Sequence, residues 1–325
     1  MKIKKVFYLV LLILLVSCSK GQITGDAVKA DKTPAEINKE IEVYFCPRDN
    51  CETALIDAIN SSEASVHCAF FDIDLKNLIS VIGKKSHSVD VRLVVDDENY
   101  GNIKGPGVRE DTSSQYSHNK FCVIDGKVVT SGSMNPTDNG ADKNNNNLLI
   151  IHSRYLAKNY EDEFKELWEG EFGKGEIVKY PIIYLNGHKT ENYFCPEDSC
   201  SKQIIEELRD AEKSIYFMAF SFTDEAIADA MLFNDKADIK GLFEKRGSGS
   251  AYSQYKRLKD FGLDVKVDSN PYTMHHKVFI IDNSTVITGS MNPTGSGDRK
   301  NDENILIIHD KDLARKYVGE FFRLF

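Results

Sequence analysis

Residues 117–135 read S-H-N-K-F-C-V-I-D-G-K-V-V-T-S-G-S-M-N, and residues 274–292 read M-H-H-K-V-F-I-I-D-N-S-T-V-I-T-G-S-M-N. Both stretches contain the pattern H-x-K-x4-D-x6-G-S-x-N, and every position of that pattern recurs in the second stretch with one constant offset. The repeated positions are His118, Lys120, Asp125, Gly132, Ser133 and Asn135, and His275, Lys277, Asp282, Gly289, Ser290 and Asn292. A pattern this long indicates an internal duplication.

The duplication sets the expected domain organisation of the 325 residues. A length of this order is typical of about two domains, and each half is long enough to bury a core. The first lobe is expected at residues 41–170 and the second at residues 190–325, with a linker at residues 171–189.

Each half alternates short apolar runs with amphipathic segments of helical period, which indicates an α/β fold. The motif itself is expected to form a β-hairpin, with residues 118–124 pairing with residues 127–131. Asp125-Gly126 between them is a strong hairpin-turn signal, and Asp282-Asn283 occupies the same place in the second copy.

The N-terminus reads as an export signal. Three lysines within the first five residues precede the unbroken apolar run of residues 6–16, which is too short to span a bilayer. The ending L-V-S-C resembles a bacterial lipobox, so we expect a signal peptide at residues 1–17 and a lipidated Cys18. The alternative is an ordinary cleaved signal with an incidental cysteine. Residues 18–40 are expected to form a flexible tether that anchors an exported protein to a bacterial membrane, in the periplasm or at the cell surface.

The other cysteines fall into two groups. Cys46–Cys51 and Cys195–Cys200 are repeat-equivalent pairs, and in an exported chain they predict one small disulfide in each lobe. A four-cysteine zinc site joining the lobes is the alternative. Cys68 and Cys122 lie in apolar runs and are expected to be buried free thiols.

The repeated motif suits the chemistry of a phosphodiester. Residues two apart on a strand point to the same face, so the histidine and lysine of each copy project together. Ser133 and Asn135, like Ser290 and Asn292, follow the partner strand and add neutral donors. Cleavage requires a nucleophile, an acid for the leaving oxygen and positive charge around the phosphoryl oxygens, and two half-sites together supply all three.

This pattern, present twice, resembles the phospholipase D superfamily, and the resemblance covers the chain after residue 40. It implies two similar α/β sandwich lobes related by a pseudo-twofold axis, one active site between them, a phosphohistidine intermediate and no metal or other cofactor. It also implies His118 as the nucleophile, His275 as the general acid, and Lys120, Lys277, Asn135 and Asn292 as ligands of the phosphoryl oxygens.

The resemblance further suggests a carboxylate about 28 residues after a motif histidine that orients its imidazole. Glu303 stands there after His275, whereas Asn146 stands there after His118. A carboxylate favours the imidazolium and an amide can only orient, so we expect Glu303 to raise the pKa of His275, the acid.

Some motif residues have simpler explanations. Asp125 and Asp282 stand where a hairpin turn favours aspartate, so a structural role is as well supported as a catalytic one. His276 is expected to point away from the site. His152 and His309 are repeat-equivalent, which suggests a packing role.

Three activities fit these observations. The first is a phospholipase D that cleaves phospholipid head groups at the membrane holding it, and the net charge of −9 favours it over a nucleic-acid enzyme. The second is an endonuclease for single-stranded DNA or RNA, using the basic residues 245–246 and 256–257. The third is a phosphatidyltransferase. Two complete motifs disfavour an inactive scaffold and make an obligatory oligomer unnecessary. The lobes differ most at residues 96–117, where we expect substrate selection.

Overall fold

Each copy of the repeat builds its own β-sheet around the motif hairpin. The computed structural model describes residues 33–325, so the expected signal peptide, the lipidated Cys18 and most of the tether lie outside the described residues. The first sheet has seven strands in the order β2-β8-β7-β6-β3-β4-β5. Its strands are β2 (Ile41–Cys46), β3 (Ser65–Phe70), β4 (Asp90–Val95), β5 (Val108–Glu110), β6 (Lys120–Ile124), β7 (Val128–Gly132) and β8 (Asn146–His152).

The second sheet repeats that order and extends it. It runs β1-β9-β10-β16-β15-β14-β11-β12-β13, and its last seven strands correspond one by one to the first sheet. Its strands are β1 (Ala35–Glu36), β9 (Ile182–Leu185), β10 (His188–Cys195), β11 (Ser214–Ala219), β12 (Asp238–Phe243), β13 (Asp264–Val267), β14 (Lys277–Ile281), β15 (Thr285–Gly289) and β16 (Glu303–Ile308). The predicted fold of two similar α/β lobes is confirmed.

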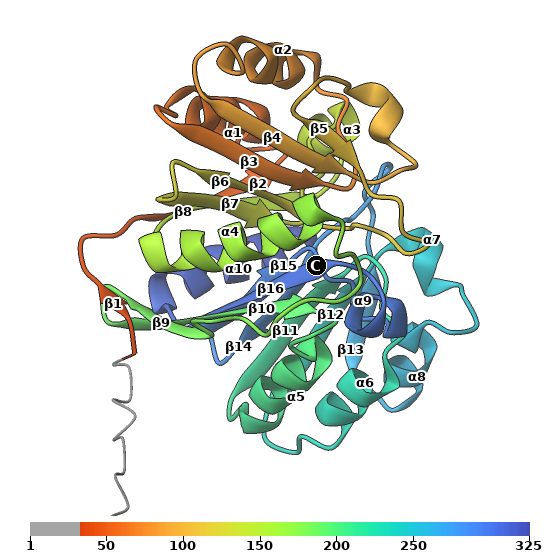
Figure 1. Cartoon of the computed structure of the whole chain (residues 1–325). Coiled ribbons are helices and arrows are strands. Elements are labelled where there is room, and N and C mark those ends of the chain that lie inside the picture. The colour runs from red at the N-terminus through yellow and green to blue at the C-terminus, as the bar shows by residue number, and fades with distance from the viewer. Residues whose placement is uncertain (1–32) are drawn as a thin grey trace, which may run out of the picture. The chain divides into compact units, whose positions relative to one another are not determined.

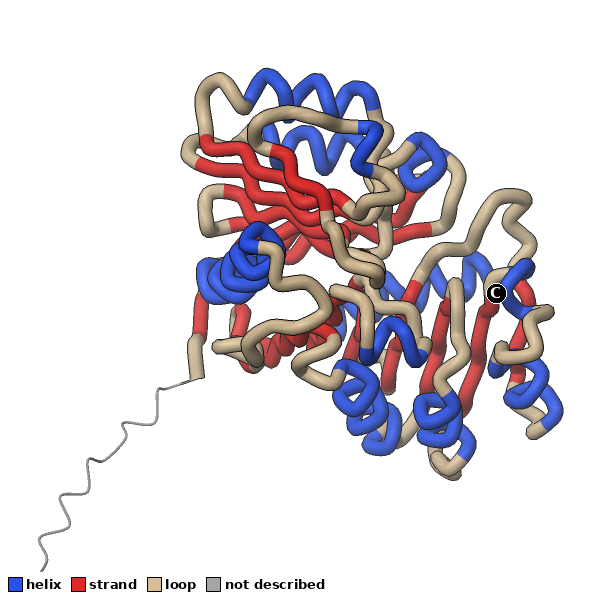
Figure 2. Tube along the Cα trace, turned by 45° about the vertical axis from the view of Figure 1, so that its right-hand side comes forward, coloured by secondary structure: helices blue, strands red, loops and turns tan. Residues whose placement is uncertain are grey.

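The helices form layers on and between the sheets (Figures 1 and 2). Helices α4 and α10, which follow the last strand of each lobe, lie between the sheets and share one core with the inner faces of both. Other helices cover the outer faces. The helices are α1 (Cys51–Asn60), α2 (Lys76–Lys85), the 3-10 turn η1 (Tyr100–Asn102), α3 (Asp138–Asp142), α4 (Arg154–Glu169), α5 (Cys200–Asp210), α6 (Glu225–Leu232), α7 (Lys245–Ser248), α8 (Gln254–Asp260), α9 (Gly295–Arg299) and α10 (Lys311–Leu324). In residues 33–325 no helix is long and apolar enough to cross a bilayer.

The central layer explains why the lobes hold together. Tyr160 and Phe164 of α4 and Tyr317 and Phe321 of α10 are fully buried against apolar side chains from both sheets. Burying an aromatic side chain contributes on the order of 2–3 kcal/mol, so this layer stabilises the interface that carries the repeated motifs.

Two predicted boundaries need correction. The tether does not extend to residue 40, because Ala35–Glu36 forms β1 and pairs in parallel with β9. The expected linker at residues 171–189 is also structured, since it contains β9 and the first residues of β10. Both segments add strands at one edge of the second sheet. The two residues of β1 give little strand signal, whereas the I-I-Y-L of β9 is an apolar run that predicts a strand.

The cysteine predictions are partly confirmed. Cys46–Cys51 and Cys195–Cys200 are disulfides, as expected, which removes the zinc alternative for these four residues. Cys68 and Cys122 are not free thiols but a third disulfide. The strand register explains this correction, because the two residues lie directly opposite each other in the β3–β6 ladder.

Candidate active site

The two motif histidines meet at the junction of the lobes. His118 precedes β6, His275 precedes β14, and both line one cavity of about 750 Å³. Each histidine is held there by the opposite lobe, because the His118 amide donates to the Asp302 carbonyl at 2.9 Å and the His275 amide to the Asn145 carbonyl at 2.8 Å. This reciprocal exchange assembles one site from two half-sites.

The imidazoles are oriented across the interface, which corrects the expected pairing. His118 Nδ1 lies 2.8 Å from Glu303 Oε2, and His275 Nδ1 lies 2.8 Å from Asn146 Oδ1. Glu303 therefore orients His118. The sequence spacing predicted His275 as its partner, and that prediction is wrong. The spacing was misleading because the first residues of β8 and β16 face the opposite lobe's motif.

The motif serines support these orienting residues. Ser133 Oγ accepts from the Asn147 amide at 3.1 Å and lies 3.3 Å from Asn146 Oδ1. Ser290 Oγ accepts from the Asn304 amide at 2.9 Å. Both serines are fully buried and neither lines the cavity, so they hold the second layer of the site in place.

The motif asparagines do face the cavity. Asn135 and Asn292 both line it, one from each lobe. Their Oδ1 atoms are buried and find no hydrogen-bond partner within residues 33–325. An unsatisfied buried amide is costly, so these side chains are poised for a polar group brought by a substrate.

The motif lysines are buried beside the histidines but differ in their contacts. Lys120 Nζ donates to the His118 carbonyl oxygen. Lys277 Nζ donates to the His275 carbonyl oxygen at 2.9 Å and also lies 3.2 Å from His275 Nε2. Phe71 and Phe220 pack against the respective imidazoles, and their rings lie 5.1 and 5.0 Å from the lysine ammoniums.

Burial dominates the electrostatics of the site. It lowers the pKa of both His118 and His275 well below the usual value, and the two lysines lower both further. Burial lowers the pKa of Lys120 to about 7 and raises the pKa of Glu303 to about 8. Nearby Lys120 and Lys277 oppose the shift of Glu303. The Glu303 carboxyl and the His118 imidazole thus face each other as a buried hydrogen-bonded pair.

Asp125 and Asp282 are not part of this site, although the motif suggested them as catalytic. Each lies in the hairpin turn, at the far end of a strand from its histidine, about 20 Å away at 3.3 Å per residue. The Asp125 carboxylate accepts from the amides of residues 63–65, and the Asp282 carboxylate from those of residues 212–214. Both fix the turn to the start of the neighbouring strand.

Sequence reasoning missed several side chains of the cavity wall. Phe71 and Phe220 could have been found, because they occupy equivalent positions after the first buried strand of each lobe. Asp97, Glu98 and Tyr116 come from the segment at residues 96–117, which the sequence comparison of the lobes had singled out. The sequence identified this segment as a difference between the lobes but did not indicate that these side chains line the cavity.

Comparison with known proteins agrees with this geometry. A family model described as cardiolipin synthase, PLD-like domain, matches residues 55–168 and 204–325. The phospholipase D of Rickettsia typhi is 34% identical over 149 residues, which are 45% of this chain and 73% of that protein. The mitochondrial cardiolipin hydrolase of Xenopus laevis is 31% identical over 135 residues, 40% of this chain and 64% of that protein.

Solved structures that span both lobes share the fold. The phosphatidylserine synthase of Haemophilus influenzae Rd KW20 aligns with a TM-score of 0.64 over 86% of this chain and 84% of its own, at 12% identity, which shows a shared fold. The family match spans most of the chain and falls on both repeats. The chain therefore belongs to the phospholipase D superfamily and is a phospholipase D-type phosphodiesterase.

Proposed function

We propose that the chain hydrolyses phospholipid head groups, with His118 as the nucleophile and His275 as the general acid. The observation that carries this assignment is the difference between the two Nε2 atoms. His275 Nε2 lies against Lys277, whereas His118 Nε2 has no hydrogen-bond partner in the described chain. With a proton on Nδ1 that is donated to Glu303, His118 would keep an unengaged Nε2 lone pair for attack.

The reaction proceeds in two displacements. His118 Nε2 attacks phosphorus, the bond from phosphorus to the head-group oxygen breaks, and His275 Nε2 donates its proton to that oxygen. Water then gives a proton to His275 and attacks phosphorus, the P–N bond breaks, and phosphatidic acid leaves. Glu303 stabilises the positive charge of the phosphorylated imidazole. The phosphodiester anion offsets the lysine charges that depress protonation of His275.

The lysines and asparagines of both motifs would hold the phosphoryl oxygens. Lys120 and Lys277 are buried beside the two histidines, so their charge would act through little solvent. Asn135 and Asn292, which line the cavity from opposite lobes, would donate neutral hydrogen bonds from Nδ2 to these oxygens.

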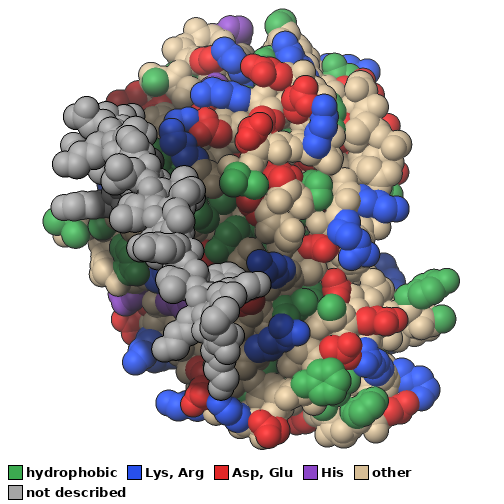
Figure 3. Space-filling view, turned by 60° about the horizontal axis from the view of Figure 1, so that its bottom comes forward, with side chains coloured by type: hydrophobic (Ala, Val, Ile, Leu, Met, Phe, Trp, Pro, Cys, Tyr) green, Lys and Arg blue, Asp and Glu red, His purple; other side chains and the backbone are tan. Residues whose placement is uncertain are grey.

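The cavity wall favours a lipid head group over a polynucleotide. The acidic side chains that line the cavity are Asp97 and Glu98. No lysine or arginine of the described residues lines it. Two carboxylates repel the neighbouring phosphates of a nucleic acid and tolerate an ammonium or neutral head group. One face of the molecule likewise shows basic and acidic side chains interspersed (Figure 3).

Two of the four basic residues expected to form the groove of the endonuclease alternative are held in ion pairs. Arg257 pairs with Asp229 and Lys256 pairs with Asp260, so these cations are already neutralised locally. They line a different cavity from the motif histidines. Transfer to an alcohol in place of water would use the same residues, and would appear as a lipid product other than phosphatidic acid.

We also propose that Cys18 anchors the exported chain to a bacterial membrane. A lipid anchor and a tether would hold the active site near a phospholipid surface. One chain contains both half-sites, so a monomer would be sufficient.

A side-by-side assay tests the proposed function. The chain from Ser19 onward would be offered phosphatidylethanolamine vesicles and single-stranded DNA and RNA in EDTA, with His118→Asn and His275→Asn as controls. We expect release of ethanolamine and phosphatidic acid, lost in both variants. Nucleic-acid cleavage without lipid hydrolysis would assign the chain to the endonuclease alternative.

A further inference from the structure

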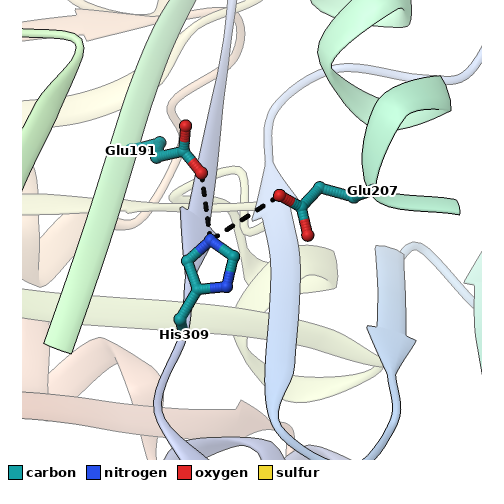
Figure 4. A group of neighbouring side chains, drawn as sticks. All are labelled: Glu191, Glu207 and His309. Atoms are coloured by element: carbon teal, nitrogen blue, oxygen red, sulfur yellow. Dashed lines mark hydrogen bonds and ion pairs between the residues drawn. The ribbon is translucent and has the colours of Figure 1, made fainter. Parts of the chain in front are cut away.

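A second group of ionisable side chains lies in the second lobe, away from the motif histidines. It joins Glu191 of β10, Glu207 of α5 and His309, which directly follows β16 (Figure 4). His309 Nε2 lies 3.0 Å from Glu191 Oε1 and 3.7 Å from Glu207 Oε1. Both carboxylates point at one imidazole nitrogen from separate elements.

We propose that these three side chains bind a zinc ion, with water completing the coordination. Imidazole nitrogen and carboxylate oxygen are zinc ligands at about 2.0–2.2 Å, and three protein ligands with water in the fourth position are a known zinc arrangement. Tetrahedral ligands at that distance are about 3.4 Å apart. The distances of 3.0 and 3.7 Å bracket this spacing, so zinc can enter with small side-chain movements.

The surrounding residues orient the ligands as a metal site requires. His309 Nδ1 lies 3.1 Å from Thr285 Oγ1, which can accept its hydrogen and leave the Nε2 lone pair for a metal. The Tyr193 hydroxyl donates to Glu191 Oε2 at 2.9 Å and leaves Oε1 facing His309. These contacts hold the imidazole and the carboxylate in orientations that a metal could use.

The internal repeat supplies a natural comparison. The first lobe keeps the equivalents of one carboxylate and the histidine, at Glu42 and His152, but has Ala58 where the second lobe has Glu207. It also has Val128 in place of Thr285. His152 is exposed and forms no ion pair among residues 33–325. The second carboxylate and the hydroxyl that orients the histidine therefore occur together only in the second of the two described lobes.

One cation competes with zinc for this group. Lys189 Nζ lies 2.7 Å from Glu191 Oε1, and its side chain is about one-third exposed. An exposed lysine can rotate into solvent when a divalent cation binds. The metal would then clamp α5 onto strands β10 and β16. His309 lies six residues from Glu303, about 20 Å along β16, so the ion would be structural and not part of the phosphodiester chemistry.

Calorimetric titration with zinc chloride and thermal unfolding test this site in the chelator-treated chain from Ser19 onward. We expect one zinc per chain at this site, a rise in Tm with zinc, and at least about tenfold weaker binding in Glu207→Ala, which installs the residue of the first lobe. Lys189→Met should bind more tightly. His152→Ala is the matched control and should bind as the parent does.

The His118→Asn variant separates this site from metal binding at the motif histidines, and it should keep the same zinc affinity. Equal zinc binding by Glu207→Ala and the parent would overturn the proposal. So would a parent that binds no zinc, which would leave the three side chains as a salt-bridge network closed by Lys189.

Discussion

At the scale of single residues, the proposed difference between the two histidines follows from what their ring nitrogens contact. His118 Nδ1 faces the Glu303 carboxyl, and His275 faces the neutral Asn146 on one side and Lys277 on the other. A carboxylate can stabilise a phosphorylated imidazole, whereas an amide can only orient. The two-lobed site is therefore symmetric in motif and asymmetric in charge.

Glu303→Gln tests the role of that charge. The amide can still face His118 Nδ1 but cannot stabilise the cationic intermediate, so kcat should fall by roughly two to four orders of magnitude, by analogy with other carboxylate–histidine pairs. Steady-state kinetics on vesicles would measure it. Asn146→Asp is the matched control at His275, and a larger loss in that variant than in Glu303→Gln would reverse the assignment.

The pKa of Lys120 predicts the alkaline limb of activity. Burial lowers this pKa to about 7, so the free enzyme loses the ammonium charge as pH rises through that value. Because kcat/KM reports the free enzyme, it should decline above about pH 7. A pH profile would show the limb, and in Lys120→Arg, which stays charged, the limb should move to higher pH. An unchanged limb in that variant would assign the titration to another group.

At the scale of elements, the motif hairpin is a brace as well as a carrier of catalytic side chains. The strands β6 and β14 bring a histidine and a lysine to one end and an aspartate to the other. Only the first end reaches the cavity. The conserved spacing within the repeat thus combines a catalytic function with a folding function.

Asp125→Ala separates these two functions. Removing the carboxylate leaves three backbone amides without their acceptor, which should lower the free energy of unfolding by about 1–3 kcal/mol. The kcat of the folded enzyme should be unchanged. Denaturant unfolding and kinetics at low temperature would measure both, with Asp282→Ala as the second-lobe counterpart. A large loss of kcat in a fully folded Asp125→Ala protein would restore a catalytic role.

The elements also show how far sequence reasoning reaches. The hairpins, the α/β alternation and the small disulfides follow from local patterns, because turn residues and apolar periods act over a few positions. The Cys68–Cys122 disulfide and the partner of Glu303 depend on strand register and on which lobe a strand end faces. Such relations join residues distant in sequence, and a single spacing rule does not encode them.

At the scale of the whole molecule, the cost of building the site is a set of buried ionisable groups at the lobe junction. Asp302 is a clear case, because its carbonyl accepts from the His118 amide and its Oδ1 accepts from the Gly173 amide, while Oδ2 is buried without a partner among the described residues. Burial raises the pKa of Asp302 to about 8. The burial of Asp302, which helps to hold His118 in place, therefore lowers the stability of the folded protein at neutral pH.

Asp302→Asn should remove part of that cost. A carboxyl whose pKa is raised on folding stabilises the native state while it stays protonated, and this contribution is lost as pH rises from about 4 to about 8. The variant and the parent should therefore have similar stability near pH 4, and the variant should be more stable above pH 8. Thermal unfolding across this range would measure the difference. A parent whose advantage grows with pH would contradict the sign.

The most direct test of the account is to trap the covalent intermediate. Quenching with denaturant at alkaline pH within the first turnover on phosphatidylethanolamine vesicles, followed by peptide mapping at the same pH, where phosphohistidine survives, identifies the modified residue. We predict the phosphatidyl group on the peptide containing His118, and no modified peptide in His118→Asn. Modification of the His275 peptide, or steady lipid hydrolysis with neither histidine modified, would contradict the account.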